Sequence, residues 1–190
     1  IAGDLTSLQC TPRGEGAAAV LLASDAALRR LGLDAKRAVR VRSSAASSET
    51  LAADDMGVAG IVDMVAASSR TALESAGVDA SDLDLVELHD AFSIEELLYT
   101  EAIGLCATGD GARFLRDGHS RIGGRCAVNA SGGLIGMGHP LGPTGIGQIA
   151  EICRQLRGEA EGRQQPDARL GLAHMIGLGS VAVAHVLERA

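Results

Sequence analysis

The sequence predicts an α/β fold in which helices cover the faces of one sheet. Strand-like and helix-like segments alternate along the chain, and from residue 37 onward their order is βαβαβαββ. The last two strands, expected at residues 170–175 and 181–187, should form a hairpin-like pair around a glycine turn. Apolar residues make up 46% of the chain but aromatic residues only 2%. We therefore expect a core of closely packed aliphatic and alanine side chains.

The first 36 residues are predicted to contain a turn, a strand and a short helix. Residues 8–12 are predicted to form the turn. The small apolar residues within 14–22 indicate a buried strand whose side chains are too small to make it stable by itself. Residues 25–31 should form a helix that ends at Gly32. This part of the chain is therefore expected to need neighbouring structure.

A strand and a long helix are predicted next. Residues 36–42 alternate charged and apolar side chains, as a half-buried strand does. Residues 43–55 are small and polar, which favours a loop. Apolar residues recur at helical spacing over residues 58–76, and Gly77 closes this amphipathic helix.

The second predicted strand, residues 83–88, ends in the polar pair His89 and Asp90. Ser93 and Glu96 fit a capping box at the start of the following helix. Polar residues between a strand end and a helix start are typical of sites in α/β folds. Among them, we expect Asp90 to be a strand-end hydrogen-bonding residue and Glu96 to be a helix cap rather than catalysts.

The glycine-rich loop of residues 128–145 is the most unusual stretch of the chain. It contains six glycines and two prolines, follows a third predicted strand at 126–128 and leads into an amphipathic helix at 143–156. Glycine is costly unless the backbone needs a positive φ or a close approach. His139 stands in the middle of the loop, just before a proline that limits local freedom. Such a loop can aim a reactive imidazole from a rigid turn.

Charge and cysteine pattern exclude several classes of protein. A net charge of −7 and a pI of about 5.2 argue against a nucleic-acid partner. The cysteines are scattered, without a C-x-x-C pair, which favours reduced thiols over a disulfide frame or a zinc site. They are Cys10, Cys106, Cys126 and Cys153. With no visible signal peptide and no apolar run that approaches a membrane span, we expect a cytoplasmic protein without a metal site.

Two nucleotide-binding interpretations of the glycine-rich loop can be weighed against its spacing. Residues 145–150 fit the G-x-G-x-x-G/A dinucleotide fingerprint, but that motif should follow a strand directly. Here a long loop intervenes and the glycines fall inside the helix. A P-loop needs Gly-Lys-Ser/Thr, and the loop contains no lysine. A dinucleotide-binding module is therefore disfavoured.

A family resemblance is far more specific. Asn-x-Ser-Gly-Gly-Leu at 129–134, followed by Gly-His-Pro-x-Gly-x-Thr-Gly at 138–145, resembles the signature loop of thiolases. These enzymes make and break carbon–carbon bonds between coenzyme A thioesters. Residues 86–93 resemble the His-Asp-Cys-Phe segment of the sterol-carrier-protein type. Further similarity lies at residues 8–19, 156–160 and 171–179.

The resemblance implies a thiolase-like fold with a mixed five-stranded sheet covered by helices. Residues 37–190 would form the C-terminal domain of a thiolase, and residues 1–36 the end of its N-terminal half. That half, in the same or a separate chain, would be the main partner, and the complete unit would be an oligomer. The implied substrate is a coenzyme A thioester of a fatty or sterol side-chain acid, with no permanently bound cofactor.

The resemblance also implies roles for four residues. His139 would raise the thiolate fraction of a nucleophilic cysteine and donate to the thioester oxygen. His89 would be the first residue of an oxyanion hole, and backbone N–H groups near Gly177 would be the second. His174 matches a histidine of the sterol-carrier branch but also fits a structural residue at a strand end.

Two groups of thiolase chemistry are missing from this chain. The nucleophilic cysteine belongs to the N-terminal half. The second, acid/base cysteine lies where this chain has Ala91, or in other branches near the position of Met175. Cys126 precedes the signature loop and offers a substitute, although a small buried structural thiol is the favoured interpretation.

Three functional hypotheses follow. The first is a thiolase-type acyltransferase whose nucleophile comes from the N-terminal half. The second is a retro-aldol lyase of steroid side-chain degradation, which would tolerate Ala91 because it needs no acid/base cysteine. The third is a non-catalytic subunit that binds a thioester or a partner. Arginines for coenzyme A phosphates are available at Arg113, Arg116, Arg121 and Arg125.

Overall fold

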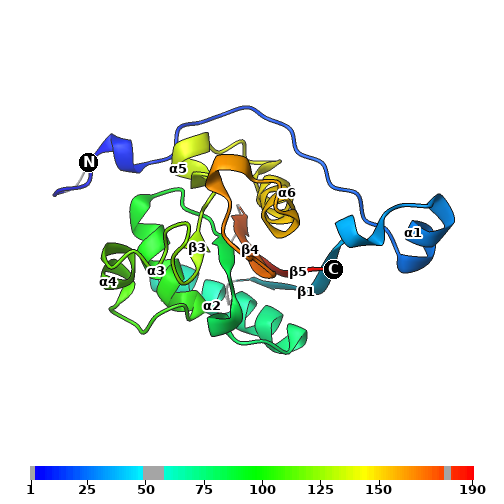
Figure 1. The fold of residues 1–190 in the computed structure, drawn as a ribbon. Helices are drawn as coiled ribbons and strands as arrows, with labels where there is room; N and C mark the ends of the chain where they lie inside the picture. Colours follow the sequence, from blue (N-terminus) through cyan, green and yellow to red (C-terminus); the bar gives the residue numbers. More distant parts are fainter. Residues whose placement is uncertain (1–2, 49–57, 178–180) are drawn as a thin grey trace.

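A computed structural model describes residues 3–48, 58–177 and 181–190 (Figure 1). Its centre is one five-stranded sheet in the order β1-β5-β4-β2-β3. Strand β5 is antiparallel to both β1 and β4, whereas β2 is parallel to both β3 and β4. The strands are β1 Val39–Ser48, β2 Leu85–Glu87, β3 Ala127–Val128, β4 Leu170–Gly177 and β5 Val181–Arg189. The predicted α/β fold with a mixed five-stranded sheet is confirmed.

Helices cover the two faces of this sheet (Figure 1). One face carries α2 (Val58–Ala76) and α3 (Ser93–Ile103), and the other carries α6 (Thr144–Arg157). Successive strand residues point to opposite faces. Val86 accordingly packs in the aliphatic core below α2, while Leu85 packs in a second core below α6. The predicted aliphatic and alanine-rich interior is present in both layers.

Strand β1 extends further than the sequence predicts. Residues 43–48, expected to be part of a loop, pair with β5 as far as Val181. The hydroxyls of Ser43 and Ser47 donate to the carbonyls of Ala72 and Met64 in α2, at 2.7 and 3.0 Å. Small polar residues can face a helix when the helix backbone accepts their protons, so polarity gave a misleading signal. The rest of the expected loop, residues 49–55, lies outside the described residues.

The predicted strand within residues 14–22 is wrong. This segment has no regular secondary structure and runs across α5 (Gly133–Met137) and α6 (Figure 1). Leu21 and Leu22 are 99% and 85% exposed. A strand requires a neighbour for its backbone hydrogen bonds, and none of the described strands lies beside it. The short helix that follows, α1 (Asp25–Leu31), ends at Gly32 as predicted.

The start of α3 differs from the predicted capping box. Phe92 is the N-cap, and the Glu95 carboxylate accepts its backbone N–H at 3.1 Å. The pairing of Ser93 with Glu96 is therefore wrong by one residue. Two short helices, α4 (Gly111–Arg116) and α5, also occur where no element was predicted, since five or six residues are too few for a periodic pattern. No helix in the described residues has the length and hydropathy required to cross a membrane.

Candidate active site

Two of the predicted site histidines face one cavity of about 330 Å³. His89 follows β2 and His139 stands in the loop before α6, while the other wall comes from the end of β4. Because β2 and β4 are parallel, their carboxyl ends meet at the same edge of the sheet. The lining residues are His89, His139, Leu141, Gly142, Met175, Ile176 and Gly177. The cavity is thus mainly apolar, with two imidazoles as its ionisable groups.

The tautomer of His139 follows from its hydrogen bonds. The Thr144 hydroxyl donates its one proton to the carbonyl of Pro140 at 2.7 Å. The same oxygen lies 2.9 Å from His139 Nδ1 and can therefore only accept there. The neutral ring thus carries its proton on Nδ1, which leaves the Nε2 lone pair free to accept a proton.

The surroundings favour the neutral form of His139. Burial lowers the pKa of His139, and the nearby His89 lowers it further, while Glu95 acts in the opposite direction. The rings of His89 and His139 meet edge to face, with centroids 5.2 Å apart and an interplanar angle of 85°. His139 is therefore suited to act as a base near neutral pH.

The loop that carries His139 is held by two carboxylates from the end of β2. Glu87 accepts the backbone N–H and the hydroxyl of Ser131 at 3.0 and 2.5 Å. Asp90 accepts the N–H of Leu134 at 2.6 Å, at the start of α5. Asp90 is thus a hydrogen-bonding residue at a strand end, as predicted. Both carboxylates fix the loop against the strand that leads to His89.

The N-terminal segment also ties the two histidine-bearing loops together. The N–H of His139 donates to the carbonyl of Pro12 at 3.1 Å, and the N–H of Thr11 donates to the carbonyl of Ala91 at 2.8 Å. The Thr11 hydroxyl donates to the carbonyl of Leu134 at 2.6 Å. Residues 11–12 therefore position the cavity from outside the sheet.

Comparison with known proteins agrees with this architecture. Residues 43–189 match the family described as thiolase C-terminal domain-like. The chain belongs to the thiolase superfamily. It is 43% identical over 181 residues to sterol carrier protein 2 of Oryctolagus cuniculus, covering 94% of this chain and 33% of that protein. It is also 43% identical to the acetyl-CoA acetyltransferase of Methanothermobacter thermautotrophicus, covering 100% of this chain and 49% of that protein.

The chain thus spans between a third and a half of these relatives. Among solved structures, it resembles one named Ltp2-ChsH2(DUF35) aldolase, with a TM-score of 0.65 and 26% identity. That match covers 76% of this chain and 38% of the other. The thiolase-like fold is therefore shared with proteins whose names indicate different reactions, so the reaction must be argued from the site.

The other predicted site residues of this thiolase domain divide between cavity and core. Gly177, the last residue of β4, lines the cavity. His174 does not, because it is fully buried beside Tyr99, with ring centroids 6.0 Å apart. Burial lowers the pKa of His174 to about 3, so its ring is neutral. Backbone N–H groups beyond Gly177, at residues 178–180, lie outside the described residues.

No cysteine among the described residues lines the cavity of this thiolase domain. Ala91 is buried and has no proton to exchange. Cys126 lies in the core on the α2 side of the sheet, where burial raises the pKa of its thiol to about 12. It is therefore a structural residue. Of the four arginines considered for phosphate binding, none lines the cavity, and Arg113 and Arg125 line a separate cavity near α4.

The buried Glu87 makes the stability of this thiolase domain pH-dependent. Burial raises the pKa of Glu87 to about 7, above the value of 4.5 expected when it is exposed. The folded state therefore binds this proton more tightly than the unfolded state, and stability falls as pH rises from about 4.5 to 7. The loss is on the order of 3 kcal/mol at 1.36 kcal/mol per pKa unit. Chemical unfolding of wild type and Glu87→Gln across this range checks this. The variant should lack the part of the slope that Glu87 contributes and keep the rest, because burial also raises the pKa values of Asp90 and Glu96, to about 6 and about 7.

Proposed function

We propose that this chain is the C-terminal half of a thiolase-type acyltransferase that acts on coenzyme A thioesters of fatty or sterol side-chain acids. The observation that carries the proposal is the pair of imidazoles at one cavity, with His139 Nε2 free to accept a proton. Thioester exchange needs a base that converts a thiol into a thiolate. The identities to sterol carrier protein 2 and an acetyl-CoA acetyltransferase support the same substrate class.

The proposed nucleophile is a cysteine of an N-terminal thiolase half, in the same polypeptide or in a partner subunit. In this proposal residues 1–36 are the end of that half and residues 37–190 form the C-terminal domain. Exposed leucines indicate an apolar surface that such a partner would cover. Leu8, Leu21 and Leu22 are at least 85% exposed, and an apolar cavity of about 430 Å³ lies between residues 20–41 and α6. Large exposed apolar patches are typical of interfaces.

In the proposed cycle, His139 Nε2 takes the proton of the cysteine thiol, and the thiolate attacks the thioester or β-keto carbonyl carbon. The C=O electron pair moves to oxygen, and the resulting oxyanion is stabilised by backbone N–H groups near Gly177 and by His89 when its Nε2 atom carries a proton. Collapse of the tetrahedral intermediate releases the leaving group, which takes up the proton that His139 Nε2 received, so that the base is regenerated. Each oxyanion donor contributes a few kcal/mol, roughly 3 in typical cases.

A second candidate is a retro-aldol lyase, and Ala91 is the observation that favours it. A lyase of this type needs no acid/base cysteine at that position. The structural likeness to a protein named as an aldolase supports this alternative. The two reactions differ in their co-substrate, because thiolysis consumes free coenzyme A and aldol cleavage does not.

The complete protein, expressed at its natural length, separates these functions. It is incubated with a 3-ketoacyl-coenzyme A plus free coenzyme A and, separately, with a 3-hydroxyacyl-coenzyme A alone. Shortened acyl-coenzyme A formed only with free coenzyme A supports the acyltransferase. Aldol cleavage without it supports the lyase, and thioester binding without either product indicates a non-catalytic subunit.

A further inference from the structure

We propose that Glu95 and His89 form a carboxylate–imidazole pair that supplies the acid/base function missing at Ala91. The pair would remove a proton from the carbon next to the thioester carbonyl and return it. The inference rests on the coenzyme A thioester substrates proposed above. It assigns a positioning role to Glu95, which no sequence motif singles out.

His89 stands at the cavity with one ring nitrogen beside a carboxylate. Its ring lines the cavity, it is only 8% exposed, and it stands edge to face against the His139 ring. Its Nδ1 atom is buried and makes no hydrogen bond of standard geometry among the described residues. That atom lies 3.4 Å from Oε2 of Glu95, within ion-pair distance. Glu95 is therefore the carboxylate that can pair with a protonated His89 ring.

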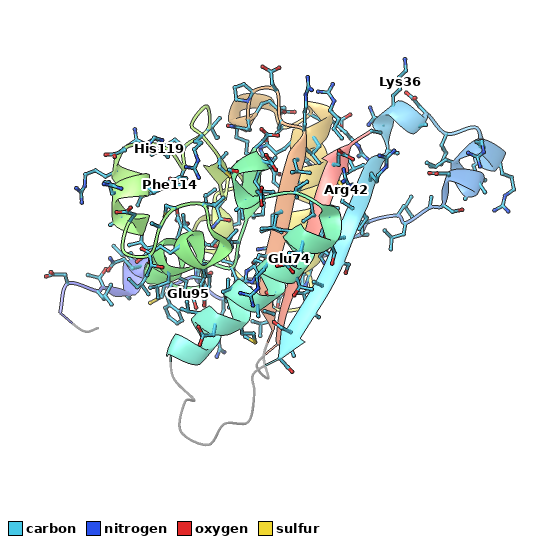
Figure 2. The ribbon with its side chains drawn as sticks, turned by 90° about the horizontal axis from the view of Figure 1, so that it is seen from below. Lys36, Arg42, Glu74, Glu95, Phe114 and His119 are labelled. Carbon is cyan, nitrogen blue, oxygen red and sulfur yellow. The ribbon has the colours of Figure 1, made fainter. Side chains whose placement is uncertain are left out.

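Glu95 is held in a fixed position by both of its oxygens. Its Oε2 accepts the backbone N–H of Phe92 at 3.1 Å, and its Oε1 accepts the hydroxyl of Tyr99 at 3.1 Å. Tyr99 is 2% exposed and part of the core. Glu95 therefore has an anchor at each oxygen, one on its own helical turn and one in the interior. Figure 2 shows Glu95 on α3, close to where the N-terminal segment passes.

Other charged and titratable groups around His89 cannot replace Glu95. Asp90 is committed to the N–H of Leu134. His139 and His174 have pKa values lowered by burial and stay neutral near pH 7. Glu96, one residue along α3, has a pKa raised to about 7 by burial, and within the described part of the chain the ion pair of His89 is with Glu95 instead. Glu95 is the carboxylate that the structure places against the ring.

This arrangement fixes what His89 can do. With the proton on Nδ1, facing the carboxylate, Nε2 has a free lone pair. When a thioester occupies the cavity, the α-carbon proton moves to Nε2 and the C–H electron pair forms the enolate. The resulting imidazolium is paired with the Glu95 carboxylate, and its Nε2–H donates to the enolate oxygen or returns to carbon. The step is a proton transfer without oxidation or reduction, so it needs no further reagent.

The test is deuterium uptake in D2O by an acetyl-coenzyme A analogue whose thioester sulfur is replaced by methylene. This ketone cannot be cleaved by thiol attack, so exchange of its α-protons reports the base alone. Mass spectrometry follows uptake with the complete protein from pH 5 to 9. Wild type is expected to catalyse exchange, and His89→Ala to lose at least roughly 100-fold, the usual contribution of a general base.

Glu95→Gln is the decisive variant. It keeps the shape but removes the charge, so exchange should slow by about 10-fold or more and the rising limb of the pH profile should move to lower pH. Glu96→Gln, the same change one residue away, should leave the limb in place. If Glu95→Gln fails to fold, Glu95→Asp retains the charge and should slow exchange without moving the limb. A profile that is unchanged in Glu95→Gln, or no exchange by wild type, overturns the inference.

The same measurements separate this inference from the proposed function. Exchange that depends on Glu95, without thiolysis of a 3-ketoacyl-coenzyme A, would support the Glu95–His89 pair and refute the acyltransferase. Thiolysis together with exchange that is insensitive to Glu95 would support the acyltransferase and refute the role of Glu95.

Discussion

Replacing His139 with asparagine in the complete protein should lower thioester cleavage by roughly 10²–10⁴-fold, the range typical of a lost general base. The reason is that His139 Nε2 is a basic atom at the cavity, whereas an asparagine side chain has no basic atom. The fold should survive, because His139 is only partly buried and its ring is hydrogen-bonded to Thr144, a contact that a smaller side chain can keep. An asparagine amide can still donate to the same hydroxyl oxygen. The effect should therefore appear in rate rather than in melting temperature.

The measurement is steady-state thiolysis together with thermal unfolding of each variant. His119→Asn is the matched control, because His119 packs against Phe114 away from the cavity (Figure 2). Thr144→Val removes the group that holds the proton on Nδ1 and should cost about 10-fold, less than loss of the ring itself. Full activity in His139→Asn would show that another group activates the nucleophile.

Much of the fold could be predicted from the sequence, because the hydrophobic periodicity of most segments agrees with their place in the sheet and its helical layers. The strand ending at His89 and the loop carrying His139 were both recognisable locally, and parallel pairing of β2 with β4 brings strand ends to one edge. The strand predicted within residues 14–22 is absent, because here the local pattern and the position in the fold disagree. Its small apolar residues fit a strand only if a neighbour exists, and pairing is not encoded in a local pattern.

The supporting residues of the site were harder to predict. Glu95 and Glu96 differ by one position, which on a helix rotates a side chain by about 100°. A capping pattern could not decide between them, because α3 starts from Phe92 and not from a serine N-cap. Thr144 belongs to the signature loop, but the motif does not reveal its role, since that role depends on the Pro140 carbonyl that takes its proton. His174 shows the converse, because a histidine near the site by resemblance proves to be buried in the core.

The loop itself gives the largest expected effect on stability, at Gly133. This residue has φ of +62° at the start of α5, a conformation that side chains rarely adopt. A Cβ added there would lie 2.7 Å from Cγ of Asp90 and closer still to Oδ2. The carboxylate would have to move and release the N–H of Leu134, which it now accepts at 2.6 Å.

Gly133→Ala should therefore lower the free energy of unfolding by about 3 kcal/mol or more, combining backbone strain with a lost charged hydrogen bond. Gly136→Ala, in the same short helix, is the matched control, because a Cβ added there would meet nothing within 4 Å and the φ of Gly136 is not positive. That change should be neutral or stabilise by about 0.5–1 kcal/mol. Urea unfolding of both variants checks the contrast. Equal stabilities would mean that neither the positive φ of Gly133 nor the close approach of Asp90 constrains this loop. The expected difference would show that the loop carrying His139 depends on a glycine at residue 133, where the backbone conformation and the Asp90 carboxylate both exclude a side chain.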